Sequence, residues 1–214
     1  RDTDFIFNTS HDFKDRFDGE PGYFSGKERL YQGTAGIAGT TIAETNFVYD
    51  LPNYPVREWK ERGAGGNTFF EIAGNVMTCH VSEFPVGTYK KAHRHGPSAH
   101  VIILKGSGYS LFWPEGSPIK RYDWREGSMM VPPDRWWHQH LNTGRTPARY
   151  LALHGMRSRK FGLGIKVYEV GKNVRAGGDQ IEPEDEAPEI RETFEKELAA
   201  SGIECRMPLW RKKG

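Results

Sequence analysis

The sequence has little of what marks a disulfide-rich or zinc-ribbon protein. Of its 214 residues only two are cysteines, Cys79 and Cys205, and they lie far apart without Cys-x-x-Cys spacing. This argues against a disulfide framework and against a thiolate zinc site. Two ordinary thiols of this kind favour a cytoplasmic location.

An excess of charge of one sign is also missing. The 30 Lys and Arg residues are balanced by 28 Asp and Glu residues, which leaves a net charge of +2. Nucleic acids and anionic membranes are bound by patches of one sign, and no apolar run approaches the roughly 20 residues that span a bilayer. We therefore expect neither a nucleic acid nor a membrane as a partner. The length of 214 residues predicts a single domain with extensions.

The sequence is rich instead in residues of turns and short strands, with 25 Gly, 13 Pro, 13% aromatic residues and 8 His. Between Asn67 and Glu169, short apolar runs alternate with glycine and proline. The runs span residues 69–73, 76–84, 100–104, 109–113, 128–131, 150–154 and 164–170. Runs at this spacing without a helical pattern predict an all-β sandwich or barrel.

The segments that flank this region differ from it in their residue patterns. Residues 1–65 show turns and aromatic side chains but no sustained period, which indicates an arm that packs on the barrel or on a second subunit. Near the C-terminus, Ile190, Phe194 and Leu198 recur at every fourth position behind Pro188, which predicts one helix. Because the arm has no evident core of its own, we expect a homo-oligomer. The predicted organisation is an N-terminal arm (1–65), a barrel (66–170), and an acidic linker with a C-terminal helix (171–214).

The histidines of the β region form two pairs with the same spacing. His93 and His95 lie two residues apart, as do His138 and His140, and on a strand such pairs point to one face. Each pair belongs to a longer block, and 20 residues separate the two blocks. The first block reads Gly87-x5-His93-x-His95-x3-Ala99-x6-Gly106, and the second reads Gly127-x5-Pro133-x-Arg135-x2-His138-x3-Asn142.

These two blocks resemble the paired motifs of the cupin superfamily. The resemblance implies a single jelly-roll barrel in which the motifs form facing hairpins and histidines bind one divalent metal ion. By position, His93, His95 and His138 would be the ligands. Ala99 stands where these proteins usually have a glutamate ligand. The adjacent His100 would become a fourth ligand only if a β-bulge turned its side chain inward.

The missing glutamate and the Trp-His-x-His-x-Asn stretch at 137–142 most resemble the three-histidine cupin dioxygenases, which include gentisate and salicylate ring-cleaving enzymes. The resemblance covers residues 87–142, about a quarter of the chain. Those enzymes usually carry two cupin domains, whereas this chain has room for one. Arg135 stands where an aromatic residue or glycine is common. The resemblance therefore supports a reaction class better than a substrate.

A set of three imidazoles points to related chemistry on its own. Imidazole suits iron, copper, nickel and zinc, and three such ligands leave coordination positions open. Without a carboxylate ligand the ion keeps both positive charges and favours an anionic, chelating substrate. We predict an iron(II) dioxygenase that acts on a small chelating aromatic or enolisable acid, with manganese, nickel, copper and zinc as alternative ions. Two other functions stay open: a non-redox lyase, isomerase or decarboxylase that uses the ion as a Lewis acid, and a binding protein without chemistry.

Four further residues are candidates for the site. Trp136 and His140 alternate with His138 and are predicted to line the same cavity. Trp136 would stack on substrate or pack in the core, and His140 would act as an acid or base or hold the site in shape. Arg135 and Arg149 are candidates to pair with a substrate carboxylate, the alternative for each being an outward, solvated side chain.

Overall fold

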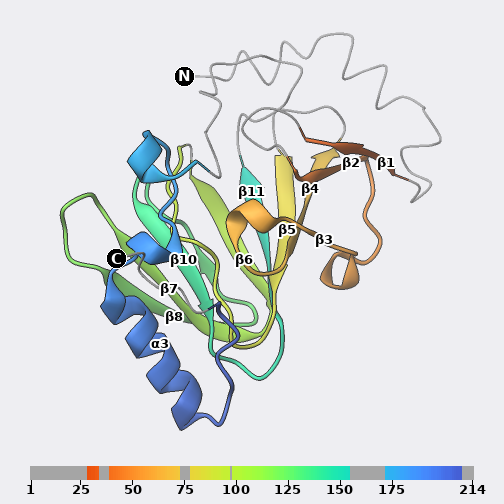
Figure 1. The fold of residues 1–214 in the computed structure, drawn as a ribbon. Coiled ribbons are helices and arrows are strands. Elements are labelled where there is room, and N and C mark those ends of the chain that lie inside the picture. The colour runs from red at the N-terminus through yellow and green to blue at the C-terminus, as the bar shows by residue number, and fades with distance from the viewer. Residues whose placement is uncertain (1–27, 34–38, 73–77, 97, 155–171, 209–214) are drawn as a thin grey trace.

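The computed structural model describes residues 28–33, 39–72, 78–96, 98–154 and 172–208, which form two β-sheets and one α-helix (Figure 1). The larger sheet has the strand order β1-β2-β4-β5-β11-β6-β9, and β3 pairs with β4 outside this path. Its strands are β1 (Arg29–Gln32), β2 (Thr41–Thr45), β3 (Arg57–Glu58), β4 (Gly66–Ile72), β5 (Thr78–Phe84), β6 (Ala99–Lys105), β9 (Met129–Met130) and β11 (Ala148–His154). The short 3₁₀ turns are η3 (Leu51–Asn53), η4 (Lys60–Arg62), η5 (Val174–Ala176) and η6 (Pro183–Asp185).

The smaller sheet consists of β7 (Ser107–Trp113), β8 (Lys120–Arg125) and β10 (Trp137–Asn142), in the order β10-β7-β8. Gly106 turns the chain from β6 of one sheet into β7 of the other, with φ at 90°. A Cβ at Gly106 would lie 2.9 Å from the Cα of Ala148, so only glycine suits this crossing. The two sheets form the two walls of a barrel.

Strand β10 divides its side chains between the barrel interior and the outer face. His138 pairs with Phe112 and His140 with Ser110 on the inner side. On the outer side, Leu141 belongs to an apolar cluster with helix α3 (Pro188–Ala200), which lies against the smaller sheet (Figure 1). Ile190, Phe194 and Leu198 are the buried residues of that helix. The four-residue period of the sequence therefore marks the face that docks on the barrel.

The larger sheet is covered on its outer face by residues of the N-terminal part of the chain. Strand β2 runs parallel to β4 and continues the sheet. Ala43, Phe70 and Val81 form a buried cluster, against which Leu51 and Tyr54 pack. The sequence showed no strand here because β2 is five residues long and mixes threonine and glutamate with its apolar residues. The segment 41–56 forms the outer apolar layer of the sheet.

The structure has the all-β class that the sequence predicted, with two sheets and one α-helix outside them. Six of the predicted apolar runs coincide with β4, β5, β6, β7, β9 and β11. Strand β8 was missed because it is largely charged and exposed. The seventh run, 164–170, lies outside the described residues. Among the helices described, none has the length and apolar character that crossing a membrane requires.

Candidate metal centre

Three histidine side chains converge inside the barrel. One ligand atom from each of His93, His95 and His138 lies within 4.8 Å of the others, and all three residues are buried. The ring centroids of His93 and His138 are 4.1 Å apart, and those of His95 and His138 are 4.8 Å apart. The backbone fixes this pair, because the N–H of His93 donates to the carbonyl of His138 at 3.0 Å and the reverse bond measures 2.8 Å.

Hydrogen bonds set the orientation of two of these rings. Nδ1 of His93 lies 3.0 Å from the carbonyl oxygen of Lys91, and Nδ1 of His138 lies 3.0 Å from that of Trp136. A carbonyl oxygen only accepts, so each Nδ1 carries the proton and each Nε2 keeps its lone pair. A backbone carbonyl on the second ring nitrogen is the usual support of a metal-binding histidine.

The surroundings also hold His93 in the neutral form that metal binding requires. Burial lowers the pKa of His93 well below its ordinary value, and the positive charge of Arg62 and the neighbouring His138 and His95 lower it further. Neutral nitrogen donors with oriented rings suit a divalent transition-metal ion. The three-histidine group therefore fits the metal that the motif blocks imply.

The histidines line a cavity of about 50 Å³ between the two sheets. Since one water needs roughly 10–15 Å³ of such space, the cavity has room for an ion with a small ligand. Among the described residues that line it there is no carboxylate, whereas Arg62 and Lys90 both contribute cations. The remaining lining residues are Trp59, Asn67, Phe69, His80, Ser82, His93, His95, Ala99, Val101, Pro132, His138, His140, Tyr150, Ala152 and His154.

His140 lies in this cavity beside the three-histidine group, as predicted, and has a defined partner. Its ring centroid is 6.0 Å from that of His138, and its Nδ1 is 2.7 Å from Oγ of Ser110. Oγ of Ser110 accepts a hydrogen bond from Nε1 of Trp124 at 3.0 Å. Burial above all lowers the pKa of His140 to about 3, so the ring is neutral.

A second pair of histidines extends the polar lining. Nε2 of His154 lies 2.8 Å from Nδ1 of His80, and the ring of His154 lies 6.1 Å from that of His95 between centroids. Both residues are on strands of the larger sheet that face the interior, β5 and β11. Their place on a strand was the only sequence signal, and it did not separate them from core histidines.

The structure removes His100 from the ligand set. His100 is exposed and pairs with Leu153 across β6 and β11, whereas the neighbouring Ala99 is buried. The register between these strands is regular at this point and shifts only between Arg149 and Tyr150. Without a bulge, the alternation of a strand turns His100 to the outer face.

Trp136 does not line the histidine cavity, in contrast to the prediction. It precedes β10 in a turn, where its N–H donates to the carbonyl of Pro133 at 3.1 Å. Its side chain lines a neighbouring groove of about 390 Å³ together with Phe112 and Met130. The alternation argument failed because it applies only within a strand, and the strand begins one residue later.

Arg135 is held at the surface rather than aimed at a substrate. Its guanidinium donates to the two carboxylate oxygens of Asp179 at 3.1 and 3.2 Å, and its side chain is 49% exposed. Arg94 donates to the same carboxylate at 2.9 Å. Arg135 has a φ of 63°, in the left-handed region that favours glycine.

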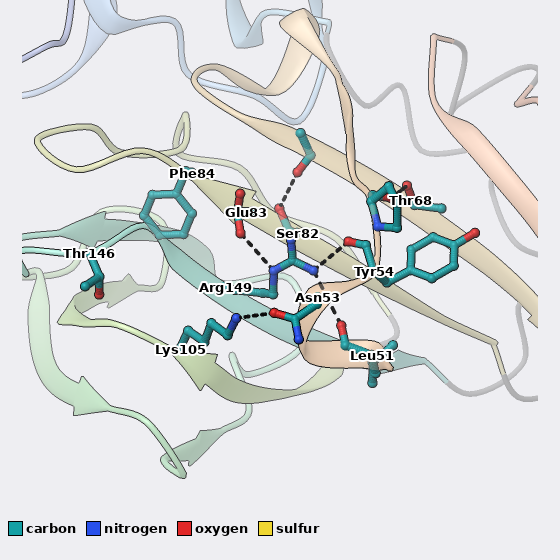
Figure 2. Close-up of polar contacts among 12 residues, drawn as sticks. Leu51, Asn53, Tyr54, Thr68, Ser82, Glu83, Phe84, Lys105, Thr146 and Arg149 are labelled. Carbon is teal, nitrogen blue, oxygen red and sulfur yellow. Dashed lines mark hydrogen bonds and ion pairs between the residues drawn. The ribbon is translucent and has the colours of Figure 1, made fainter. Parts of the chain in front are cut away.

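Arg149 is buried but is not among the residues that line the cavity; Figure 2 shows its contacts. Its Nε donates to Glu83 at 2.8 Å, and its Nη1 donates to the carbonyls of Tyr54 at 2.7 Å and Leu51 at 3.4 Å. Figure 2 shows the guanidinium among these groups, which accept hydrogen bonds from its Nε and Nη1. Its role is to anchor the outer segment to β5 and β11, not to bind substrate.

We expect Arg149→Met to destabilise the protein by roughly 2–4 kcal/mol, because the change removes the guanidinium that donates to Glu83 and to the carbonyl oxygen of Tyr54. Metal content should stay at the wild-type level, since no atom of this cluster reaches the cavity. Urea unfolding followed by circular dichroism measures the first effect, and elemental analysis the second. Loss of metal without loss of stability would contradict this assignment.

Two cationic residues of the cavity, Lys90 and Arg62, were not identified from the sequence. In a regular strand Lys90 and His93, three residues apart, would face opposite sides. The chain pairs Tyr89 with Leu141 but His93 with His138, so one extra residue is inserted between these pairs. This bulge brings Lys90, opposite His140, to the same inner face as His93.

Several solved structures align with part of the chain at low sequence identity. No protein-family model matches it, and no curated protein matches it. The cysteine peptidase Peruvianin-I from Thevetia peruviana latex aligns with 17% identity and a TM-score of 0.44, over 53% of this chain and 74% of that one. An oxalate decarboxylase from Lactobacillus farciminis, in a formate complex, aligns with 17% identity and a TM-score of 0.43, over 50% and 32%. CapF with a tropolone inhibitor aligns with 18% identity and a TM-score of 0.41, over 50% and 33%. The chain thus spans less than two thirds of the latter two.

Proposed function

We propose that this protein is a metal-dependent cupin oxidoreductase, an iron(II) dioxygenase acting on a small chelating aromatic or enolisable acid. The observation that carries the proposal is the group of three buried, converging histidines, His93, His95 and His138, in a cavity whose described lining has no carboxylate. Iron(II) bound there would supply open positions for an anionic chelate and for dioxygen. Manganese, nickel, copper and zinc suit the same donors.

In this proposal the ligand histidines and His140 have different roles. His93 and His138 are held ready by the carbonyls on their Nδ1 atoms. His140 lies beside the group and would hold or move a proton of the bound acid. These histidines are buried, and a buried setting strengthens each electrostatic contact made with the bound acid.

Oxygen consumption tests the reaction class. With iron(II) and a panel of 2-hydroxybenzoates, catechols and enolisable 2-oxo acids, we expect at least one compound to be consumed with about one dioxygen each. Under argon its turnover should fall by about 10²-fold or more, because dioxygen is a substrate. An oxygen electrode with parallel chromatography of the acid measures both. Turnover at an unchanged rate under argon would instead establish a non-redox lyase or isomerase, which would use the ion as a Lewis acid.

A further inference from the structure

Lys90 is a buried cation whose ammonium group has no hydrogen-bond partner within the described parts of the chain. The residue is 4% exposed and lines the histidine cavity. Its Nζ lies 5.8 Å from the ring centroid of Phe84. Burying an ammonium without a partner costs several kcal/mol, so a position of this kind calls for a partner, and the described residues do not provide one.

The charged neighbours of Lys90 do not neutralise it. Glu83 is the acid that acts on its pKa, but that carboxylate is bonded to Arg149 on the other side of β5. Arg62 adds a second positive charge, and His140 on the facing strand β10 is neutral. On β5 and β11 the ionisable groups of the cavity wall are His80, His154 and Tyr150.

The net effect is an electropositive cavity. Burial first, and then the charge of Arg62, lowers the pKa of Lys90 to about 7, against the weaker opposite effect of Glu83. A carboxylate beside the ammonium would favour the charged form and raise this pKa again. Binding of an anion should therefore take up a proton above about pH 7, and the affinity should fall as the pH rises.

We propose that Lys90, with Arg62 beside it, is an anion subsite of the cavity that binds a carboxylate of the substrate. The subsite is separate from the three-histidine group, so the substrate class is an acid whose carboxylate is held by these cations while its chelating groups face the histidines. This deepens the proposed function and rests on it for the identity of the substrate. The anion subsite itself does not depend on any reaction.

The test is carboxylate binding by the purified protein, with acetate and benzoate as probes. Calorimetric titration at pH 6.5 in a carboxylate-free buffer should show that Lys90→Met weakens both probes by about 10-fold or more. Lys196→Met removes an equal charge from an exposed position of α3 and should leave the affinity within about two-fold. The wild-type affinity should decrease from pH 6.5 to pH 9.

A His138→Ala variant separates this proposal from the proposed function. If the probes still bind to it and binding still requires Lys90, the anion subsite stands whatever the metal or the reaction. Equal binding by Lys90→Met and the wild-type protein, or no binding by the wild-type protein at either pH, would overturn the subsite. A probe that requires His138 but not Lys90 would be a metal ligand and would overturn it as well.

Stability gives a second readout that a structural role would not produce. Because the pKa of Lys90 is lower in the folded chain than in the unfolded one, its burial costs stability below about pH 7, and the cost disappears above the ordinary lysine pKa near 10.4. Lys90→Met should therefore raise the Tm by about 5 °C or more at pH 6.5 and by much less at pH 10. A lowered Tm at pH 6.5 would assign Lys90 to packing and overturn the proposal.

Discussion

His93→Ala and His138→Ala proteins are expected to purify without stoichiometric metal, whereas the wild-type protein is expected to bind one divalent ion per chain. Each substitution removes one of three converging donors, and the described part of the cavity has no carboxylate to replace it. The loss of affinity should exceed the 10- to 100-fold that removal of an outer hydrogen-bond partner causes. Elemental analysis of protein from its native host, followed by metal titration of the variants, measures it.

His100→Ala is the matched control, because it removes a histidine from the same motif block on the outer face of β6. It should keep full metal content and unchanged stability within about 0.5 kcal/mol, as surface substitutions usually do. If His138→Ala kept stoichiometric metal, the three-histidine assignment would be wrong. If His100→Ala lost it, the exposed side chain would have to reach the ion by a rearrangement of β6.

The three-histidine group could be located from the sequence because its geometry is local. Two histidines two residues apart share a face of an extended chain, and the motif spacing carries His138 to the facing hairpin. The exclusion of His100 follows from the same alternation, since Ala99 points inward and the next residue must point outward. In these stretches, local backbone geometry alone determines which side chains meet.

The cationic part of the cavity could not be found in this way. Lys90 reaches the inner face only because the pairing with β10 gains one residue between Tyr89 and His93. A bulge has no reliable signal in a single sequence, and it reverses the face of every residue before it. Trp136 was misplaced for the related reason that its turn precedes the strand.

Alternation also divides a strand into two faces without saying which face is inside. On β11, Tyr150 and His154 belong to the cavity, whereas Arg149 points to the outer layer. That layer exists because Leu51 and Tyr54 pack there, about 95 residues away in sequence. The environment of the Arg149 side chain is thus determined by a contact between distant segments. Neither the composition nor the periodicity of the sequence reveals such a contact.

The hydrogen bonds around His140 bear on which of its ring nitrogens carries the proton. The hydroxyl of Ser110 accepts from Trp124, so its single proton goes either to Nδ1 of His140 at 2.7 Å or to Sδ of Met130 at 3.2 Å. An imidazole nitrogen is a stronger acceptor than a thioether. If Ser110 donates to Nδ1, the stronger of the two acceptors, neutral His140 carries its proton on Nε2.

We predict that His140→Ala keeps near-full metal content but loses activity by about 10²-fold or more, the usual effect of removing an acid or base group. The ring lies beside the three-histidine group without belonging to it, so the ion keeps its donors while the bound acid loses its proton partner. Elemental analysis and turnover measured on the same preparation separate the two effects.

Ser110→Ala provides the graded control for His140, because it removes the hydrogen-bond partner of Nδ1 and leaves the ring in place. The tautomer is then no longer fixed, and we expect a loss of activity of about 10-fold, the lower end of the range for outer partners, with full metal content. Equal loss of metal and activity in His140→Ala would make His140 a ligand. Unchanged activity with lowered stability would make it a structural histidine, and the proton of the bound acid would then have to be held by another group of the cavity.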